Sequence, residues 1–183
     1  MNLSVSTSVG HANTEASPWV VLSVERYLAS RRGPSSADRV ASGVSSLKAL
    51  DLACGGGRHS KYLASLGFEV HAVDRQVPVE SLGPGVIFEQ IDLELPDAQT
   101  HWPLPTDAYD PIVVTNYLHR PTFHHLCGSL KPGGVLIYET FMDGNAQFGS
   151  PKNPDFLLRS GELLELTKPL QVLAFEQGMR VDP

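Results

Sequence analysis

Residues 50–58 read Leu-Asp-Leu-Ala-Cys-Gly-Gly-Gly-Arg, and this stretch is the strongest indication of the fold class. The short apolar run over 47–53 predicts a buried strand, and the glycines join it directly to a helical pattern over 58–66. Glycine at such a turn tolerates a positive φ and lets a ligand approach the backbone closely. The helix N-terminus that follows favours an anionic group. The stretch therefore predicts the ligand-binding turn of a β–α unit.

The pattern beyond this turn alternates between strands and helices. Ser160 is the expected N-cap of the last helix, and Lys131-Pro132-Gly133-Gly134 is expected to end the helix before it. Alternation of this kind predicts a doubly wound, mostly parallel α/β sheet with helices on both faces. The predicted strands are 68–73, 86–91, 111–115, 135–141 and 170–176, and the predicted helices are 121–130 and 160–166.

The N-terminal part of the chain predicts one helix and two irregular segments. Residues 1–16 are expected to be disordered, and 34–46 to be a flexible linker of small polar residues. Between them, Ser17-Pro18 is a favourable helix start for residues 17–33. The rest, 47–183, is expected to form a single Rossmann-like core.

Composition excludes several classes of protein. The 183 residues are 42% hydrophobic and 19% charged, which suits one globular domain. Lysine and arginine number 14 against 20 acidic residues, so the charge of −6 argues against a nucleic-acid or anionic-membrane partner. Two distant cysteines indicate neither a disulfide framework nor a zinc cluster, which favours a cytoplasmic location. No secretory signal or membrane-spanning stretch is expected.

Polar residues follow successive predicted strands. Asp74 closes the second, Asp92 the third, and Asn116 follows the fourth. Ligands of open parallel sheets bind at the carboxyl ends of the strands, and a carboxylate there can accept from both ribose hydroxyls. These positions predict a nucleoside-containing cofactor. The dinucleotide fingerprint is incomplete because Ser60 stands in its third glycine position, and no P-loop Gly-Lys-Ser/Thr follows.

The 50–58 stretch resembles the first motif of the class I S-adenosylmethionine-dependent methyltransferases. Ala53 stands where that motif usually has its first glycine. Asp74, Asp92 and the Lys131–Gly134 turn match later landmarks in the same order, so the resemblance covers about residues 47–141. Within the class, Gly57-Arg58-His59-Ser60 and the 160–166 helix are similar to the small tellurite-resistance methyltransferases.

The resemblance implies S-adenosylmethionine as cofactor and assigns its contacts. Asp51 would steer the methionine ammonium, Asp74 would hold the ribose, and Asp92 would accept from the adenine amino group. The other implied cofactor contacts are Ala53, Gly55, Gly57, Arg75, Leu93, Asn116, Tyr117 and Leu118.

The methyl acceptor is expected to be a small molecule, such as a thiol or a soft oxyanion like tellurite. Nucleic-acid methyltransferases resemble Asn/Asp-Pro-Pro-aromatic where this chain has Asn116-Tyr117-Leu118-His119. A thiolate or oxyanion acceptor requires no general base. If a base is needed, His119 and Tyr138 are the candidates, and Arg120 or Arg159 would hold an anionic acceptor.

Two alternatives remain open. A non-catalytic protein that binds S-adenosylmethionine or S-adenosylhomocysteine would have the same cofactor half. An NAD-dependent oxidoreductase is disfavoured by Ser60. Cys54 is expected to be a packed small residue, and His119, His124 and His125 to be surface residues, so no metal site is predicted.

The end of the sequence differs from the class pattern. Methyltransferases of this class usually finish with a seventh, antiparallel strand, and residues 177–183 are too few and too polar to form one. We therefore expect the last strand to be missing. The strand at 135–141 would keep an open edge, which invites pairing with a second copy as a homodimer.

Overall fold

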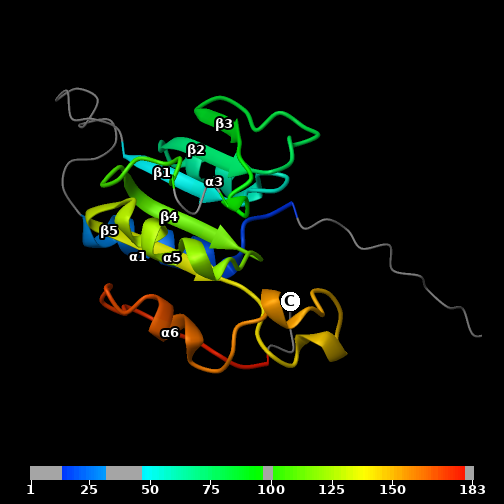
Figure 1. Ribbon diagram of the computed structural model, residues 1–183. Coiled ribbons are helices and arrows are strands. Elements are labelled where there is room, and N and C mark those ends of the chain that lie inside the picture. The colour runs from blue at the N-terminus through cyan, green and yellow to red at the C-terminus, as the bar shows by residue number, and fades with distance from the viewer. Residues whose placement is uncertain (1–13, 32–46, 97–100, 180–183) are drawn as a thin grey trace, which may run out of the picture.

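A parallel five-stranded sheet forms the centre of the protein (Figure 1). The structure is a computed structural model that describes residues 14–31, 47–96 and 101–179. The strand order is β3-β2-β1-β4-β5, and all four pairings are parallel. The predicted doubly wound α/β fold is confirmed. The strands are β1 (Lys48–Leu52), β2 (Glu69–Asp74), β3 (Val86–Gln90), β4 (Tyr109–Thr115) and β5 (Leu130–Glu139).

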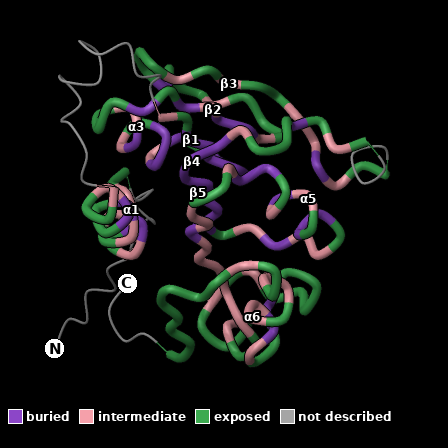
Figure 2. The backbone as a smooth tube through the Cα atoms, turned by 90° about the vertical axis from the view of Figure 1, so that its left-hand side faces the viewer, coloured by how far each residue is buried: buried purple, intermediate pink, exposed green. Residues whose placement is uncertain are grey.

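Helices cover both faces of this sheet. In Figure 2 the helices α1 (Pro18–Ser30) and α3 (Arg58–Ser65) lie to the left of the strands and α5 (Phe123–Gly128) lies to the right. Every residue of β4 is buried, as expected for a strand covered on both faces. The helix α6 (Glu162–Leu166) lies beyond the β5 edge of the sheet. Short 3-10 turns occur at Arg120–Thr122, Asn145–Gln147 and Pro154–Phe156.

The helix α1 runs from the carboxyl ends of the strands to their amino ends. Ser17 is its N-cap as predicted, because the Ser17 hydroxyl accepts a hydrogen bond from the Trp19 N–H at 3.2 Å. At the other end, Arg31 pairs with Asp110 at the start of β4. Val20 and Val24 are fully buried against the sheet. The N-terminus of α1 therefore lies at the edge of the sheet where ligands are expected.

Residues 14–16 correct one expectation. They lie in the segment predicted to be disordered, yet the Arg58 guanidinium donates to the Glu15 carbonyl oxygen at 3.3 Å. A contact of this kind joins residues far apart in sequence, so local composition gives no sign of it. Residues 1–13 of that segment, and the linker predicted at 34–46, lie outside the described residues.

The start of β5 is also different from the prediction. The Lys131–Gly134 turn was expected to precede the strand, but β5 begins at Leu130, opposite Tyr109. The pairing then shifts register, because Pro111 lies opposite Val135. The extra residues form a bulge, and a Cβ on Gly134 would lie 2.7 Å from the Asp110 carbonyl oxygen. Glycine is required where the two strands approach this closely.

The C-terminal elements require two corrections. No strand forms over 170–176, where one was predicted, and the described sheet ends at β5. The Gln177 side chain instead accepts from the Gly161 N–H and donates to the Ser160 hydroxyl, which holds this segment against the start of α6. Ser160 is consequently not the N-cap of α6. That position is Gly161, whose φ is 74°.

The amino end of the sheet contains a buried carboxylate, Asp110, whose ion pairs contribute to the stability of the fold. Asp110 is 2% exposed and accepts from Lys131 Nζ at 2.7 Å, Arg31 Nη1 at 3.1 Å and the Lys48 N–H at 3.0 Å. Asp110→Asn leaves both cations without their partner charge. We expect urea denaturation to show a loss of about 2–4 kcal/mol in unfolding free energy.

A surface ion pair provides the matched control for this variant. Lys61 and Glu80 lie 3.6 Å apart with both side chains largely exposed. Glu80→Gln is expected to change the unfolding free energy by less than about 0.5 kcal/mol. Equal losses in the two variants would contradict the distinction between the buried and the exposed pair.

Candidate functional site

One large cavity opens at the carboxyl ends of the strands. Its volume is about 1110 Å³, which is enough for a nucleoside-sized ligand. The loops that follow the first four strands line it, as the sequence predicted, and the segment around Ser150–Phe156 adds a further wall. Nine of the eleven predicted cofactor contacts line this cavity: Ala53, Gly55, Asp74, Arg75, Asp92, Leu93, Asn116, Tyr117 and Leu118.

The glycine loop leaves room for a ligand beside the backbone. A Cβ added to Gly55 would meet no protein atom within 4 Å, so the space beside it belongs to the cavity. Ala53 has a φ of 57°, a conformation that costs a residue with a side chain about 1 kcal/mol. Gly57 does not line the cavity. It caps α3 with a φ of 75°, and a Cβ there would overlap Leu82.

Asp74 joins the glycine loop to the end of β2. One carboxylate oxygen accepts from the Gly55 N–H at 2.9 Å and the other from the Gln76 N–H at 2.8 Å. Each oxygen keeps a second lone pair for a ligand hydroxyl. The pair of backbone bonds fixes the carboxylate at the mouth of the cavity in one orientation.

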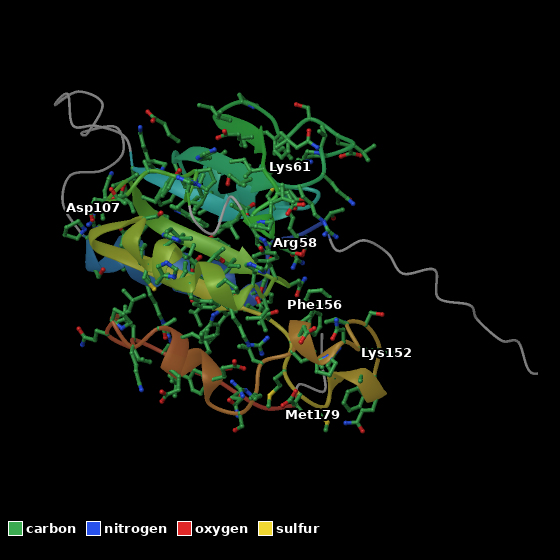
Figure 3. All side chains as sticks on the ribbon, viewed as in Figure 1. Arg58, Lys61, Asp107, Lys152, Phe156 and Met179 are labelled. Atoms are coloured by element: carbon green, nitrogen blue, oxygen red, sulfur yellow. The ribbon has the colours of Figure 1, made fainter. Side chains whose placement is uncertain are left out.

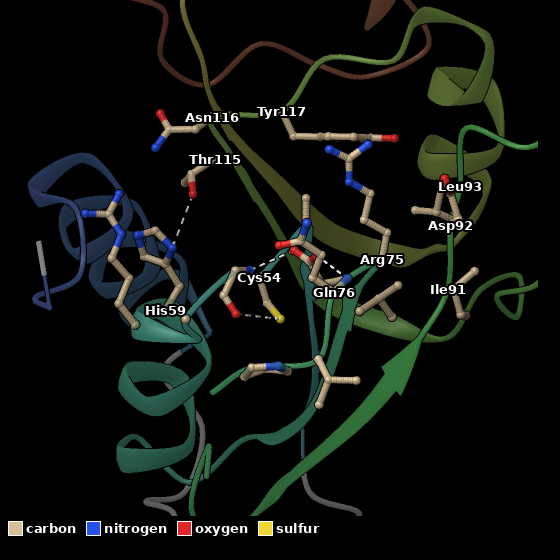
Figure 4. Close-up of a pocket in the computed structure, with 18 of the residues that line it drawn as sticks. Cys54, His59, Arg75, Gln76, Ile91, Asp92, Leu93, Thr115, Asn116 and Tyr117 are labelled. Atoms are coloured by element: carbon tan, nitrogen blue, oxygen red, sulfur yellow. Dashed lines mark hydrogen bonds between the residues drawn. The ribbon is translucent and has the colours of Figure 1, made fainter. Parts of the chain in front are cut away.

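The far end of the cavity carries Asp92 and Leu93. Asp92 Oδ1 accepts from the Glu94 N–H at 3.0 Å, which forms a tight turn and leaves Oδ2 for a donor on a ligand. Figure 4 shows the Arg75 guanidinium beside the Tyr117 ring above this end. The Tyr117 hydroxyl is buried without a hydrogen-bond partner. Burial, with Glu94 and Asp92 nearby, raises the pKa of Tyr117, so the phenol is neutral.

The loop after β4 is held in a strained conformation. Asn116 has a φ of 54°, which few residues other than glycine adopt. Its N–H donates to the Glu139 carbonyl oxygen at 2.9 Å, and the Tyr138 hydroxyl donates to the Tyr117 carbonyl oxygen at 2.5 Å. Tyr138, a candidate base, does not line the cavity, and burial raises the pKa of its phenol. The structure places Tyr138 as a support for this loop.

Asp51 lies behind the cavity and does not line it. The carboxyl group is 1% exposed, and the Ser60 hydroxyl donates to its Oδ2 at 2.5 Å. Burial raises the pKa of Asp51 to about 6, the largest effect on it, although the bond from Ser60 opposes the shift. This arrangement links the end of β1 to the first turn of α3 and so supports the glycine loop from behind.

His59, the second residue of the same helix, lines the other end of the cavity. Its ring is 1% exposed, and its Nε2 accepts from the Ser17 N–H at 3.1 Å. His59 Nδ1 lies 3.3 Å from Thr115 Oγ1. Burial, with the Arg58 charge beside it, lowers the pKa of His59 to about 4. The imidazole is therefore neutral at pH 7. Figure 4 shows His59, Thr115 and Asn116 at the end opposite Asp92 and Leu93.

The other predicted candidates lie away from the cavity. His119, Arg120 and Arg159 are not among its lining residues. The Arg120 guanidinium binds Glu162 at 2.7 and 3.0 Å, and these bonds hold the pKa of Glu162 at about 2. Arg159 donates to the same carboxylate. This cluster anchors α6. Both guanidinium groups are therefore engaged in ion pairs with Glu162 that stabilise the fold.

Sequence patterns missed part of the wall. Arg58 and Phe156 both line the cavity, and Figure 3 shows them at the same side of the molecule, far from Asp107. Phe156 belongs to a region predicted only as a loop. Its position follows from the Arg120 bonds to the carbonyl oxygens of Asp155 and Leu157, at 2.6 and 2.8 Å. Arg58 and His59 follow the glycine loop directly, and this position is the local sign in the sequence that they lie at the cavity.

The remaining predicted groups are placed as follows. Cys54 is buried in a small apolar cluster, and burial raises the pKa of its thiol to about 12, so it is a packed residue. His125 stacks on Trp102, with ring centroids 5.4 Å apart. Within the described ranges, no helix has the length and apolar character needed to cross a bilayer.

Sequence comparisons connect this site to known proteins. A family model described as "Tellurite resistance protein TehB" matches residues 28–91. A ubiquinone biosynthesis O-methyltransferase from Shewanella sp. (strain ANA-3) is 31% identical over 114 residues, which cover 56% of this chain and 47% of that protein. The chain spans about half the length of the curated relatives that it matches.

Comparisons with solved structures agree with the sequence comparisons. TehB from Haemophilus influenzae aligns with a TM-score of 0.56 and 23% identity, over 76% of this chain and 51% of that chain. Phosphoethanolamine N-methyltransferase 2 from Haemonchus contortus, solved with S-adenosyl-L-methionine, aligns with a TM-score of 0.52 and 16% identity, over 79% of this chain and 36% of that one. The predicted resemblance to the class I methyltransferases, and their fold, are confirmed.

Two buried groups of this site predict opposite pH effects on stability. The folded protein keeps the Asp51 proton up to about pH 6 while the unfolded chain loses it near 3.8, so this group weakens folding as pH rises through that window. His59 binds its proton near 4 when folded and near 6.5 when unfolded, so it strengthens folding as pH rises. The two effects largely cancel in the native protein.

Asp51→Asn removes only the first effect. We expect the unfolding free energy of this variant to rise from pH 4 to 6 more steeply than that of the native protein, by about 1 kcal/mol per pH unit. Urea denaturation at several pH values measures the two slopes. Asp143→Asn, an exposed carboxylate outside the cavity, is the control. Parallel curves for the native protein and Asp51→Asn would rule out a buried, protonated Asp51.

Proposed function

We propose that this chain binds S-adenosylmethionine and transfers its methyl group to a small-molecule acceptor. One observation carries the proposal. Three successive strand ends bring Gly55, Asp74 and Asp92 onto a single cavity, each with an open position for a ligand. The similarity to named methyltransferases supports the same reading.

The residues present fit the parts of this cofactor. Asp74 has two fixed acceptor oxygens for the two ribose hydroxyls. Asp92 Oδ2 suits the adenine amino group, with the Leu93 N–H as a donor to a ring nitrogen. The open space beside Ala53 and Gly55 suits the methionine part. Asp51 would act on that part only from behind the loop, through its support of α3.

The bound cofactor supplies a methyl group on a cationic sulfonium, which is already activated for in-line displacement. The protein's task is then to orient the two reactants and to exclude water. Asn116 is suited to the first part, because its N–H bond to Glu139 and the Tyr138 bond to the next residue fix its strained conformation. A thiolate or oxyanion acceptor needs no proton transfer to a side chain.

For the acceptor, we propose a thiol or a soft oxyanion such as tellurite. The description of the matching family model supports this choice. The cavity wall includes Arg58, whose guanidinium charge suits a small acceptor with negative charge. The charge of −6 disfavours nucleic acid.

We further propose a cytoplasmic location and a homodimer through the outer edge of β5. Both Cys54 and Cys127 are free thiols, as expected in a reducing compartment. In the described part of the chain β5 is the last strand of the sheet. An edge strand of this kind presents backbone groups to a second copy.

Ligand binding tests the cofactor. S-adenosylhomocysteine at about 100 times its dissociation constant should stabilise the fold by roughly 2.7 kcal/mol, a rise of about 5–10 °C in Tm. NAD should leave Tm unchanged. Asp74→Asn should weaken binding by about 10–100-fold, because it loses the charge on the bonds to ribose. Asp143→Asn should bind as the native protein does.

The outcomes separate the competing functions. A shift with NAD alone would support an oxidoreductase. A folded protein that responds to neither ligand would contradict the proposal. If S-adenosylmethionine binds but no S-adenosylhomocysteine forms with any thiol or with tellurite as the acceptor, the non-catalytic alternative is favoured.

A further inference from the structure

The segment before α1 is held beside the cavity by three contacts from two elements, α3 and β5. Its residues 14–17 form what we call the N-terminal segment, and Thr14 lines the cavity. Arg58 on α3 donates to the Glu15 carbonyl oxygen. His59 on the same helix accepts from the Ser17 N–H, and Glu139 at the end of β5 accepts from the Ser17 hydroxyl. The structure thus fixes a piece of chain that its own composition does not order.

The bond to His59 requires one protonation state of the ring. Because Nε2 accepts from the Ser17 N–H, the single ring proton is on Nδ1, where it donates to Thr115 Oγ1. A second proton on Nε2 would face the Ser17 N–H and abolish the bond. The imidazole is 1% exposed, so water does not replace this partner.

The charged groups around the ring leave it neutral. Arg58 lies beside it on α3 and disfavours a second positive charge. Asp51 on β1 is occupied by Ser60. On β5, Glu139 binds the Ser17 hydroxyl. The Glu15 carbonyl oxygen accepts from Arg58 on α3.

We propose that His59 is a positioning residue, which holds the N-terminal segment as a wall at the Asn116 end of the cavity. That end lies opposite Asp92 and Leu93, so under the proposed function it is where the methyl group is transferred (Figure 4). The wall would exclude water from the reacting atoms. Protonation of His59 releases the segment and opens this end, so the wall is present at neutral pH and lost in acid.

Amide exchange of Ser17 in the ligand-free protein tests this inference by NMR. If protonation of His59 opens the segment, the protection factor of the Ser17 amide should fall about tenfold per pH unit below pH 6.5 and level off near pH 4. The amide of Leu50 in β1 serves as an internal control for global unfolding. Its protection should stay well above that of Ser17 throughout.

Two variants separate positioning from simple packing. In His59→Gln the Oε1 atom replaces Nε2 as acceptor but does not titrate, so Ser17 should remain protected at pH 4.5. In His59→Met no acceptor remains, so protection should be lost at every pH while Leu50 stays protected. Equal Ser17 protection in the Met variant and the native protein, or no pH dependence in the native protein, would overturn the inference.

A binding measurement separates this inference from the proposed function. If Ser17 behaves as expected but S-adenosylhomocysteine does not bind, the wall exists and the cofactor assignment fails. If S-adenosylhomocysteine binds and His59→Met leaves the Ser17 protection unchanged, the cofactor assignment stands and the positioning role of His59 fails.

Discussion

Parallel pairing of β1 with both β2 and β4 is the constraint on which the rest of the structure depends. Leu52 lies opposite Val73 on one side and Val114 on the other, so the three strands end at the same level. Parallel neighbours need crossover connections, which place every loop that follows a strand at one edge. The cavity is a direct consequence of this register.

The chemistry of the cavity depends on features that folding alone would not favour. Ala53 and Asn116 hold left-handed conformations at the ends of adjacent strands, and the Tyr117 hydroxyl is buried without a partner. Strain and unsatisfied groups persist only where the surrounding structure fixes them, and they concentrate at functional sites. Here the fixing contacts are hydrogen bonds to the loop backbone. The Asp74 carboxylate and the Glu139 carbonyl oxygen accept from loop N–H groups, and the Tyr138 hydroxyl donates to a loop carbonyl oxygen.

The sequence predicted the sheet and most of the cavity because both follow from local patterns. Apolar runs and glycine turns locate β1 to β4, and polar strand ends such as Asp74 then fall on the cavity through the parallel register. The sequence-based predictions failed for segments whose conformation depends on contacts with residues far away in the chain. The 170–176 segment has the apolar content of a strand, but the Gln177 bonds direct it toward α6. Likewise, His59 gains its contact with Ser17 from a partner 42 residues away.

The proposed function requires that the strand-end cavity holds an S-adenosyl ligand. A crystal structure of the protein with S-adenosylhomocysteine tests it most directly. We expect both ribose hydroxyls within about 2.6–3.2 Å of the Asp74 carboxylate, the adenine amino group at Asp92, and the methionine part beside Gly55. An adenosyl ligand bound elsewhere on the chain, or in this cavity with its ribose away from Asp74, would contradict the proposed cofactor site.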